Sequence, residues 1–213
     1  MKEYLKSKKN FFIFALALFL VSTVIGVFFQ PEFIKNYIGE MVKALLEQVK
    51  GKDFFQLFVF IFKNNLMISI FGMFLGIMLG IYPIFLLLIN GYFIGFIISF
   101  AVGREGLTAI LSILPHGIFE IPAVIISLGL GINLGFKLIS NFASLHKKSY
   151  WIFVLAIVPF ILFLALFIEN LRVKKLKNLL IYELKNCGKV LVYVILPLLI
   201  VAGLIETILI FFK

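Results

Sequence analysis

Long apolar runs, separated by short polar connections, occupy most of this chain. They cover residues 11–29, 66–102, 107–135, 151–168 and 190–212, and most charged residues lie between or outside them. A helix of about 20 apolar residues, rising 1.5 Å per residue, spans the roughly 30 Å hydrocarbon core of a bilayer. The pattern therefore predicts an all-α polytopic membrane protein with about five spanning helices, built as one integral membrane domain over residues 1–213.

Residues 31–53 follow a different pattern and predict an interfacial amphipathic helix at the outer surface of the membrane. Six apolar positions recur at helical spacing, while four lysines and four acids occupy other positions. The apolar positions are Ile34, Ile38, Met41, Val42, Leu45 and Val49. Because its charges cancel, such a helix suits packing or docking better than attachment to anionic lipid.

The uncharged run of residues 66–102 is long enough for two spans and predicts a tight hairpin. Proline removes a helical hydrogen bond and Asn-Gly favours a turn, so the chain is expected to reverse at Tyr82-Pro83 or at Asn90-Gly91. Glycines recur every four residues on both arms, at Gly72, Gly76 and Gly80 and at Gly91 and Gly95. Small residues on one stripe let helix backbones approach each other in lipid. These glycines are therefore predicted to pack against another helix, within the protomer or in a homodimer.

Two prolines divide the next run, residues 107–135, and predict a helix that breaks inside the membrane. The eight residues before Pro115 would extend only about 12 Å, less than half of the hydrocarbon core. Pro115, Gly117 and Pro122 therefore predict a broken or re-entrant helix pair that enters and leaves the membrane on the same side.

The distribution of basic residues predicts the orientation in the membrane. The linker of residues 169–189 carries six basic residues against two acids, which predicts an amphipathic helix on the cytoplasmic surface. Residues 136–150 carry three basic residues and are expected outside. The lysine-rich tail before residue 11 places the N-terminus in the cytoplasm, and the last span then ends outside. The N-terminal tail and the linker of residues 169–189 can both be cytoplasmic only if the chain crosses the membrane an even number of times between them. The other predicted spans give four crossings, so residues 107–135 must enter and leave on the same side.

The composition supports this class of protein and narrows its partners. Hydrophobic residues make up 63% of the chain and charged residues 14%, which is more apolar surface than a soluble domain of this size could bury. Lipid contact and orientation account for the net charge of +10, so a nucleic-acid partner is not expected. The single cysteine, Cys187, excludes an internal disulfide and a cysteine-based metal cage.

Three ionisable residues, His116, Glu120 and Glu206, fall inside apolar runs. A charge in the bilayer core is costly, so these residues are expected to meet in one buried cluster. The cluster could be a structural hydrogen-bond group, a site for a divalent metal such as zinc, or a path for protons or a transported ion. An intramembrane hydrolase would need the same residues to activate a water molecule. The His-Glu-x-x-His, Ser/Lys and paired-Asp patterns of hydrolases are missing from the sequence, so no catalytic residue is predicted.

Several motifs together resemble the stage II sporulation protein M family. The most characteristic is Leu-Pro-His-Gly-Ile-Phe-Glu-Ile-Pro-Ala at residues 114–123, and the others extend the resemblance from Asn64 to the C-terminus. They are Asn64-Asn65, the Gly72, Gly76 and Gly80 stripe, Asn90-Gly91 with Gly95, and Ile205-Glu206. The resemblance implies a membrane scaffold, which in spore formers joins a peptidoglycan amidase/endopeptidase to a lytic transglycosylase during engulfment.

The expected function is accordingly that of a multi-pass scaffold or assembly protein in the cell membrane, without enzymatic activity or a resident cofactor. Its expected partners are the lipid bilayer, membrane or cell-wall enzymes, and a second copy of the chain. The alternative is a small membrane transporter or an ion- or metal-binding protein that uses His116, Glu120 and Glu206.

Overall fold

The computed structural model describes residues 1–106, 109–145 and 174–212, and every regular element within these ranges is a helix. The α-helices are α1 (Lys2–Ser7), α2 (Lys9–Phe28), α3 (Glu32–Val49), α4 (Phe54–Phe74), α5 (Ile81–Glu105), α6 (Ala109–Leu145), α9 (Lys174–Val190) and α10 (Leu196–Phe211). A 3-10 turn, η1 (Leu75–Ile77), follows α4, and a π-helical segment, η2 (Leu191–Ile195), joins α9 to α10. The all-α fold class is confirmed.

Five helical segments in the described part of the chain are long and apolar enough to cross a membrane. They are Lys9–Phe28, Phe54–Ile77, Ile81–Gly103, Gly117–Asn141 and Lys177–Phe211. This confirms a polytopic membrane protein with five candidate spans. The set differs from the predicted one, because residues 107–135 were not expected to cross and the predicted span of residues 151–168 lies outside the described residues.

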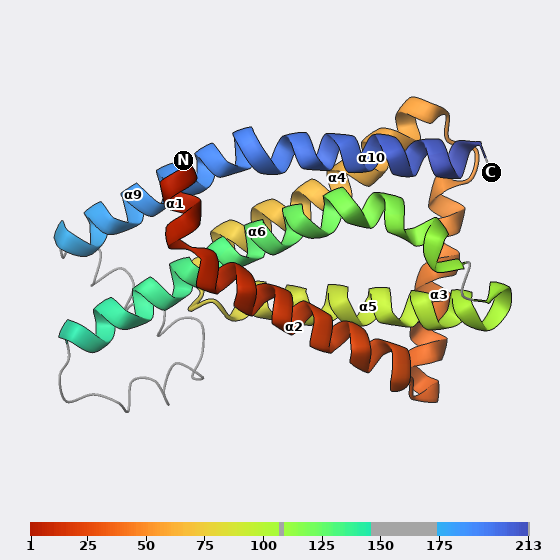
Figure 1. The fold of residues 1–213 in the computed structure, drawn as a ribbon, viewed down its shortest axis with the longest axis horizontal. Coiled ribbons are helices and arrows are strands. Elements are labelled where there is room, and N and C mark those ends of the chain that lie inside the picture. Colours follow the sequence, from red (N-terminus) through yellow and green to blue (C-terminus); the bar gives the residue numbers. More distant parts are fainter. Residues whose placement is uncertain (107–108, 146–173, 213) are drawn as a thin grey trace.

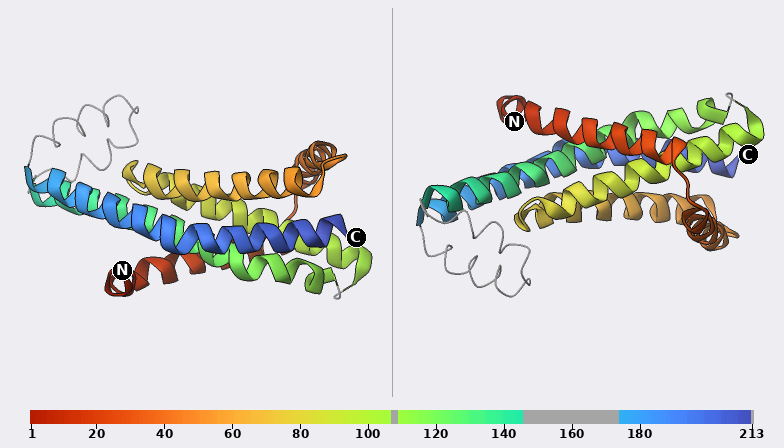
Figure 2. Two further views of the ribbon diagram at one scale, coloured as in Figure 1. Left: turned by 90° about the horizontal axis from the view of Figure 1, so that it is seen from above. Right: turned by 90° about the horizontal axis from the view of Figure 1, so that it is seen from below.

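The long helices lie side by side along one axis, and α3 lies across one end of the bundle (Figures 1 and 2). We call this the α3 end and the opposite end the α9 end. Helix α2 packs mainly on α5, whereas α6 contacts α2, α4, α5 and α10. Every residue of α6 from 123 to 135 except Ile126 is buried, so α6 is the central helix.

The predicted break in residues 107–135 is wrong, because α6 is one helix of 37 residues that contains both prolines. At 1.5 Å per residue it extends about 55 Å, enough to cross a bilayer completely. Proline removes one helical hydrogen bond and bends a helix, but in a membrane protein neighbouring helices can stabilise the bend. Figure 1 shows α6 bent near its N-terminal end, which is the part that contains Pro115 and Pro122.

The predicted hairpin is present, but the chain reverses between α4 and α5 at residues 75–80 rather than at either predicted turn. Leu79 and Gly80 have φ values of 56° and 74°, the left-handed conformation that turns the chain. Pro83 lies in the first turn of α5, where its missing N–H has no helical acceptor. Asn90 lies inside α5 and donates its side-chain amide to the Leu86 carbonyl at 2.7 Å. The first arm also begins earlier than expected, at Phe54.

The basic linker is not a separate surface helix, because α9, η2 and α10 form one continuous helical run (Figure 1). Leu138 near the end of α6 packs with Leu180 near the start of α9, so these two helix ends lie together at the α9 end. The prediction that the two connections lie on opposite sides is therefore wrong for their described parts, residues 136–145 and 174–189. The prediction assumed that residues 107–135 enter and leave the membrane on the same side, whereas α6 runs the full length of the bundle.

Glycines form the contact of α4 and the following turn η1 with α6, here called the α4–α6 contact. A Cβ added at Gly76 would collide with the backbone of Gly131, and one added at Gly72 would collide with the Leu128 side chain. At the turn after α4, Gly80 lies against Gly135. These positions keep two helix backbones close without side chains between them, which is the packing mode that membrane helices use in place of hydrophobic collapse.

A second set of glycines forms the contact between α2 and α5. A Cβ at Gly91 would approach the Phe19 carbonyl oxygen to 2.6 Å, and a Cβ at Gly95 would overlap the Thr23 carbonyl. From the other side, Gly26 of α2 faces the backbone of Tyr92. Both predicted glycine stripes thus lie at helix contacts within a single protomer.

Candidate functional site

Two groups of buried polar side chains interrupt the apolar interior. The first, here called the carboxylate pair, consists of Glu120 on α6 and Glu206 on α10. The second, the lysine–glutamate cluster, lies toward the α9 end and consists of Tyr4, Lys8, Asn133, Lys137 and Glu183.

The carboxylate pair includes two of the three residues predicted to meet. Glu120 and Glu206 are both half-buried, and they lie close enough for their charges to repel each other. The side chain of Asn65, buried on α4, hydrogen-bonds Glu120. Asn65 was not predicted as a site residue, although an asparagine at the start of an apolar run is a polar signal of the same kind as Glu120.

His116 belongs to α6 one turn before Glu120, but its side chain lies outside the described residues. Its meeting with Glu206 therefore stays a prediction, and so does a metal site formed by His116, Glu120 and Glu206. Within the ranges whose side chains are described, His, Cys, Asp and Glu do not gather in a group of three that could hold a metal ion.

One further polar atom lies near this region of α4. The Ser69 side chain is fully buried one turn after Asn65, and its hydroxyl has no hydrogen-bond partner among the described residues. The buried face of α4 thus carries an amide and an unpaired hydroxyl in its apolar interior. Asn65 hydrogen-bonds Glu120, whereas Ser69 lies one turn further along the same helix.

The lysine–glutamate cluster joins three helices around the carboxylate of Glu183, which has 0% exposure on α9. Tyr4 donates its hydroxyl to Glu183 Oε2 at 2.7 Å, and Asn133 donates to the same oxygen at 3.2 Å. Lys8 Nζ lies 3.3 Å from Glu183 Oε1 and donates to Asn133 Oδ1 at 3.1 Å. Lys137 forms a second ion pair with Glu183 Oε1.

The cluster contains two ammonium groups and one carboxylate, so its formal charge is positive. Burial lowers the pKa of Lys8, and the nearby Glu183 carboxylate opposes that shift. Burial also raises the pKa of the Tyr4 hydroxyl, which keeps it protonated as a donor to Glu183. Each of the four polar groups that contact the Glu183 carboxylate donates to it, which is the arrangement that a buried carboxylate requires.

The sequence interpretation missed this cluster, because it placed Lys8 in a solvated tail and Glu183 in a surface linker. The sequence of α9 did contain a pattern that indicates burial of Glu183. Leu180, Glu183, Cys187 and Val190 are three, four and three residues apart, and all four are buried. A helix buries residues at this spacing on one stripe.

Comparison with known proteins confirms the resemblance. A family model described as stage II sporulation protein M matches residues 15–171, which include Asn65, Glu120 and Asn133. An uncharacterized protein of Methanocaldococcus jannaschii is 28% identical over 184 residues, covering 76% of this chain and 82% of that protein. No solved structure matches the chain.

Proposed function

The chain belongs to the stage II sporulation protein M family, and we propose that it is a membrane scaffold that holds a partner protein at its outer face. In this proposal the chain performs no catalysis itself. Its spanning helices fix a platform in the bilayer, and α3 presents that platform to the partner.

The observation that carries this proposal is the exposed apolar face of α3. Phe33 is 73% exposed and Tyr37 is 69% exposed, and Met41 and Leu45 continue this stripe at four-residue spacing with exposures of 37% and 38%. Ile38 is the one residue of α3 that is buried. Exposed apolar faces of this kind mark sites where a protein or a membrane binds. The near-balanced charges of α3 and its flanks favour a protein over an anionic lipid surface.

The orientation we propose places α3 outside the cell. Basic residues gather at the α9 end, where α1 contributes Lys2 and Lys6, and α9 contributes Lys177, Lys185 and Lys189. Cytoplasmic ends of membrane proteins carry an excess of lysine and arginine. The N-terminus is then cytoplasmic, and α3 faces the envelope, where a wall-remodelling enzyme would be found.

Site-specific photo-crosslinking tests the scaffold role. A benzoylphenylalanine placed at Tyr37 in native membranes should give a crosslinked product with an envelope protein, identified by mass spectrometry. The same probe at Phe85, exposed on the lipid-facing side of α5, is the control and should capture lipid only. A product of twice the chain mass at Tyr37 would identify a homodimer instead. Lipid alone at Tyr37 would show that α3 lies on the membrane surface, and the scaffold proposal would then fail.

The carboxylate pair favours a second candidate, an ion-binding or transporting membrane protein. Two carboxyl groups that repel each other inside a bundle are stabilised by a shared proton or a cation. Asn65 supplies a neutral ligand beside Glu120. Elemental analysis of the purified protein distinguishes the candidates, because an ion-binding protein should retain a stoichiometric metal and a scaffold need not.

A further inference from the structure

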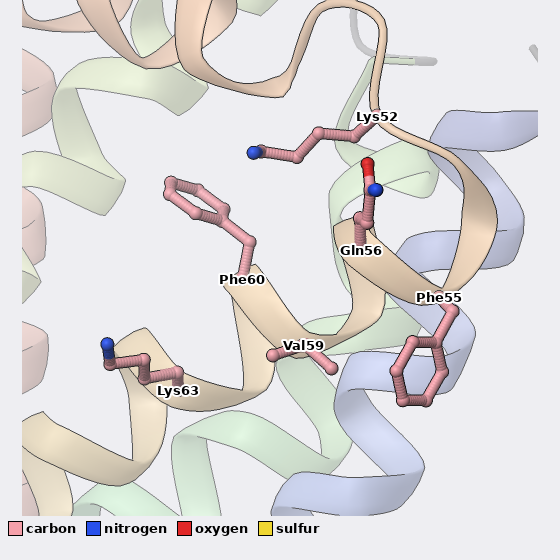
Figure 3. Close-up of a pocket in the computed structure, with 6 residues that line it drawn as sticks. All are labelled: Lys52, Phe55, Gln56, Val59, Phe60 and Lys63. Carbon is pink, nitrogen blue, oxygen red and sulfur yellow. The ribbon is translucent and has the colours of Figure 1, made fainter.

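A surface hollow lies on α4 beneath the loop that joins it to α3. It has a volume of about 340 Å³ and is lined by Lys52, Phe55, Gln56, Val59, Phe60 and Lys63. Figure 3 shows the two lysines on either side of the Phe60 ring, with Phe55 and Val59 along the same stretch of helix. The hollow therefore combines an apolar floor with a cation at each end.

Neither cation has a carboxylate partner in the part of the chain that the structure describes. The ion pairs found in the described ranges are those of Lys8 and Lys137 with Glu183, so Lys52 and Lys63 are not paired there. Lys52 Nζ lies 5.6 Å from the centre of the Phe60 ring. The nearest acid in sequence, Asp53, is engaged in capping α4, where its side chain accepts from the Gln56 backbone at 2.8 Å.

The position of Lys63 makes an unpaired charge costly. It is exposed and is the tenth residue of α4, about 14 Å along the helix from Phe54. A lysine on the lipid-facing side of a span must extend its ammonium toward the headgroups or find an anion. Gln56 adds a donor nearby, because its side-chain oxygen accepts from Asp53 N at 3.3 Å and leaves its NH₂ group available.

We propose that this hollow binds an anionic phospholipid of the leaflet at the α3 end. Lys52 and Lys63 hold the phosphate from two sides, Gln56 donates to it, and an acyl chain lies along Phe55 and Val59. A lipid fits better than a soluble phosphate, because Phe55 is 71% exposed and the floor is apolar. The lipid would fix the α3–α4 loop at the membrane surface.

Native mass spectrometry of the detergent-purified chain tests the proposal. The protein is titrated with dioleoyl phosphatidylglycerol and, separately, with dioleoyl phosphatidylcholine. Phosphatidylglycerol should bind tighter, and the double variant Lys52→Gln/Lys63→Gln should weaken its binding by roughly tenfold without changing phosphatidylcholine binding. The matched control Lys35→Gln/Lys43→Gln removes two lysines from α3, outside the hollow, and should leave the preference intact.

Two further measurements decide between the remaining outcomes. Lys63→Arg keeps the charge and should retain the preference, which separates loss of a binding site from loss of fold. Millimolar inorganic phosphate should not displace the lipid, and displacement would identify a simple anion site instead. Equal affinity for both lipids in the wild-type chain, or an equal loss in the α3 control, would overturn the proposal.

Discussion

Glu183 is the residue on which the α9 end of the bundle depends most. Its carboxylate is fully buried and is held by donors from the N-terminal segment and α6. Removing one partner of a buried ion pair leaves the other charge without compensation, whereas replacing both with apolar residues can be neutral. The cluster therefore joins the N-terminal segment to α6 and α9 through charge.

Glu183→Leu should lower the free energy of unfolding by about 3 kcal/mol, because Lys8 then stays buried without its carboxylate. The measurement is thermal unfolding in detergent. Glu47→Leu, on the exposed surface of α3, is the control and should change little. The double variant Lys8→Met/Glu183→Leu should recover part of the loss. An unchanged melting temperature for Glu183→Leu would show that the cluster contributes nothing to stability.

Glu206 distinguishes the two roles of the carboxylate pair. If the pair is structural, Glu206→Gln should be tolerated, since an amide keeps hydrogen-bonding capacity, while Glu206→Leu should destabilise by about 1 to 3 kcal/mol. If the pair binds a metal, Glu206→Gln and His116→Ala should both abolish the metal content found by elemental analysis. If Glu206→Leu is tolerated and the wild-type protein contains no bound metal, the pair has neither a structural nor a metal-binding role.

At the residue scale, the sequence identified polar groups inside apolar runs and missed those at their ends. Glu120 and Glu206 stand out because apolar residues surround them. Lys8 lies next to other lysines, so its burial depends on a tertiary contact that no local pattern contains. Glu183 lies among basic residues, and only its spacing with the buried residues of α9 indicates its burial. The interpretation of charges at a membrane boundary requires knowing which helix packs on which.

The contact between α4 and α6 explains the glycine spacing at the scale of whole elements. The Gly76 and Gly131 backbones approach so closely that neither position has room for a side chain. Because both sides of the contact are backbone, the helices would have to separate to accept a larger residue. The same holds where Gly95 meets the Thr23 carbonyl on α2.

Gly76→Leu should therefore destabilise the bundle by at least the roughly 1 to 3 kcal/mol typical of overpacking. Gly39→Leu provides the comparison, since a Cβ at Gly39 of α3 meets nothing within 4 Å. Both variants are compared with the wild type by thermal unfolding in detergent. A loss of equal size at both positions would refute the role of the α4–α6 contact.

Element boundaries were less predictable than element type. The periodicity of residues 31–53 predicted an amphipathic helix, and α3 is helical over most of that range. Proline 115 and proline 122 were expected to break a helix, yet α6 continues through both and packs against α2, α4, α5, α9 and α10. The effect of a proline on a helix depends on such neighbours. The turn at Leu79-Gly80 uses a glycine in the left-handed conformation, a residue that the sequence interpretation had assigned to the packing stripe.

The whole molecule is a bundle whose two ends differ in charge and in length. Gly135 lies against the turn after α4, so residues 136–145 of α6 extend about 15 Å beyond that turn, with α9 alongside (Figure 2). Lys8 and Lys137 meet Glu183 near the level where this extension begins. In the proposed orientation the cytoplasmic boundary of the membrane lies there, since lysines favour that boundary.

Cysteine accessibility in intact cells tests the complete crossing of α6, on which the proposed topology depends. Single cysteines replace Lys43, Gly106, Ser140 and Lys177 in a Cys187→Ala background, and a membrane-impermeant maleimide labels them from outside. The account predicts labelling at positions 43 and 106, and protection of positions 140 and 177 until the membrane is opened. Labelling of 106 and 140 from the same side, or of 140 and 177 from opposite sides, would contradict it.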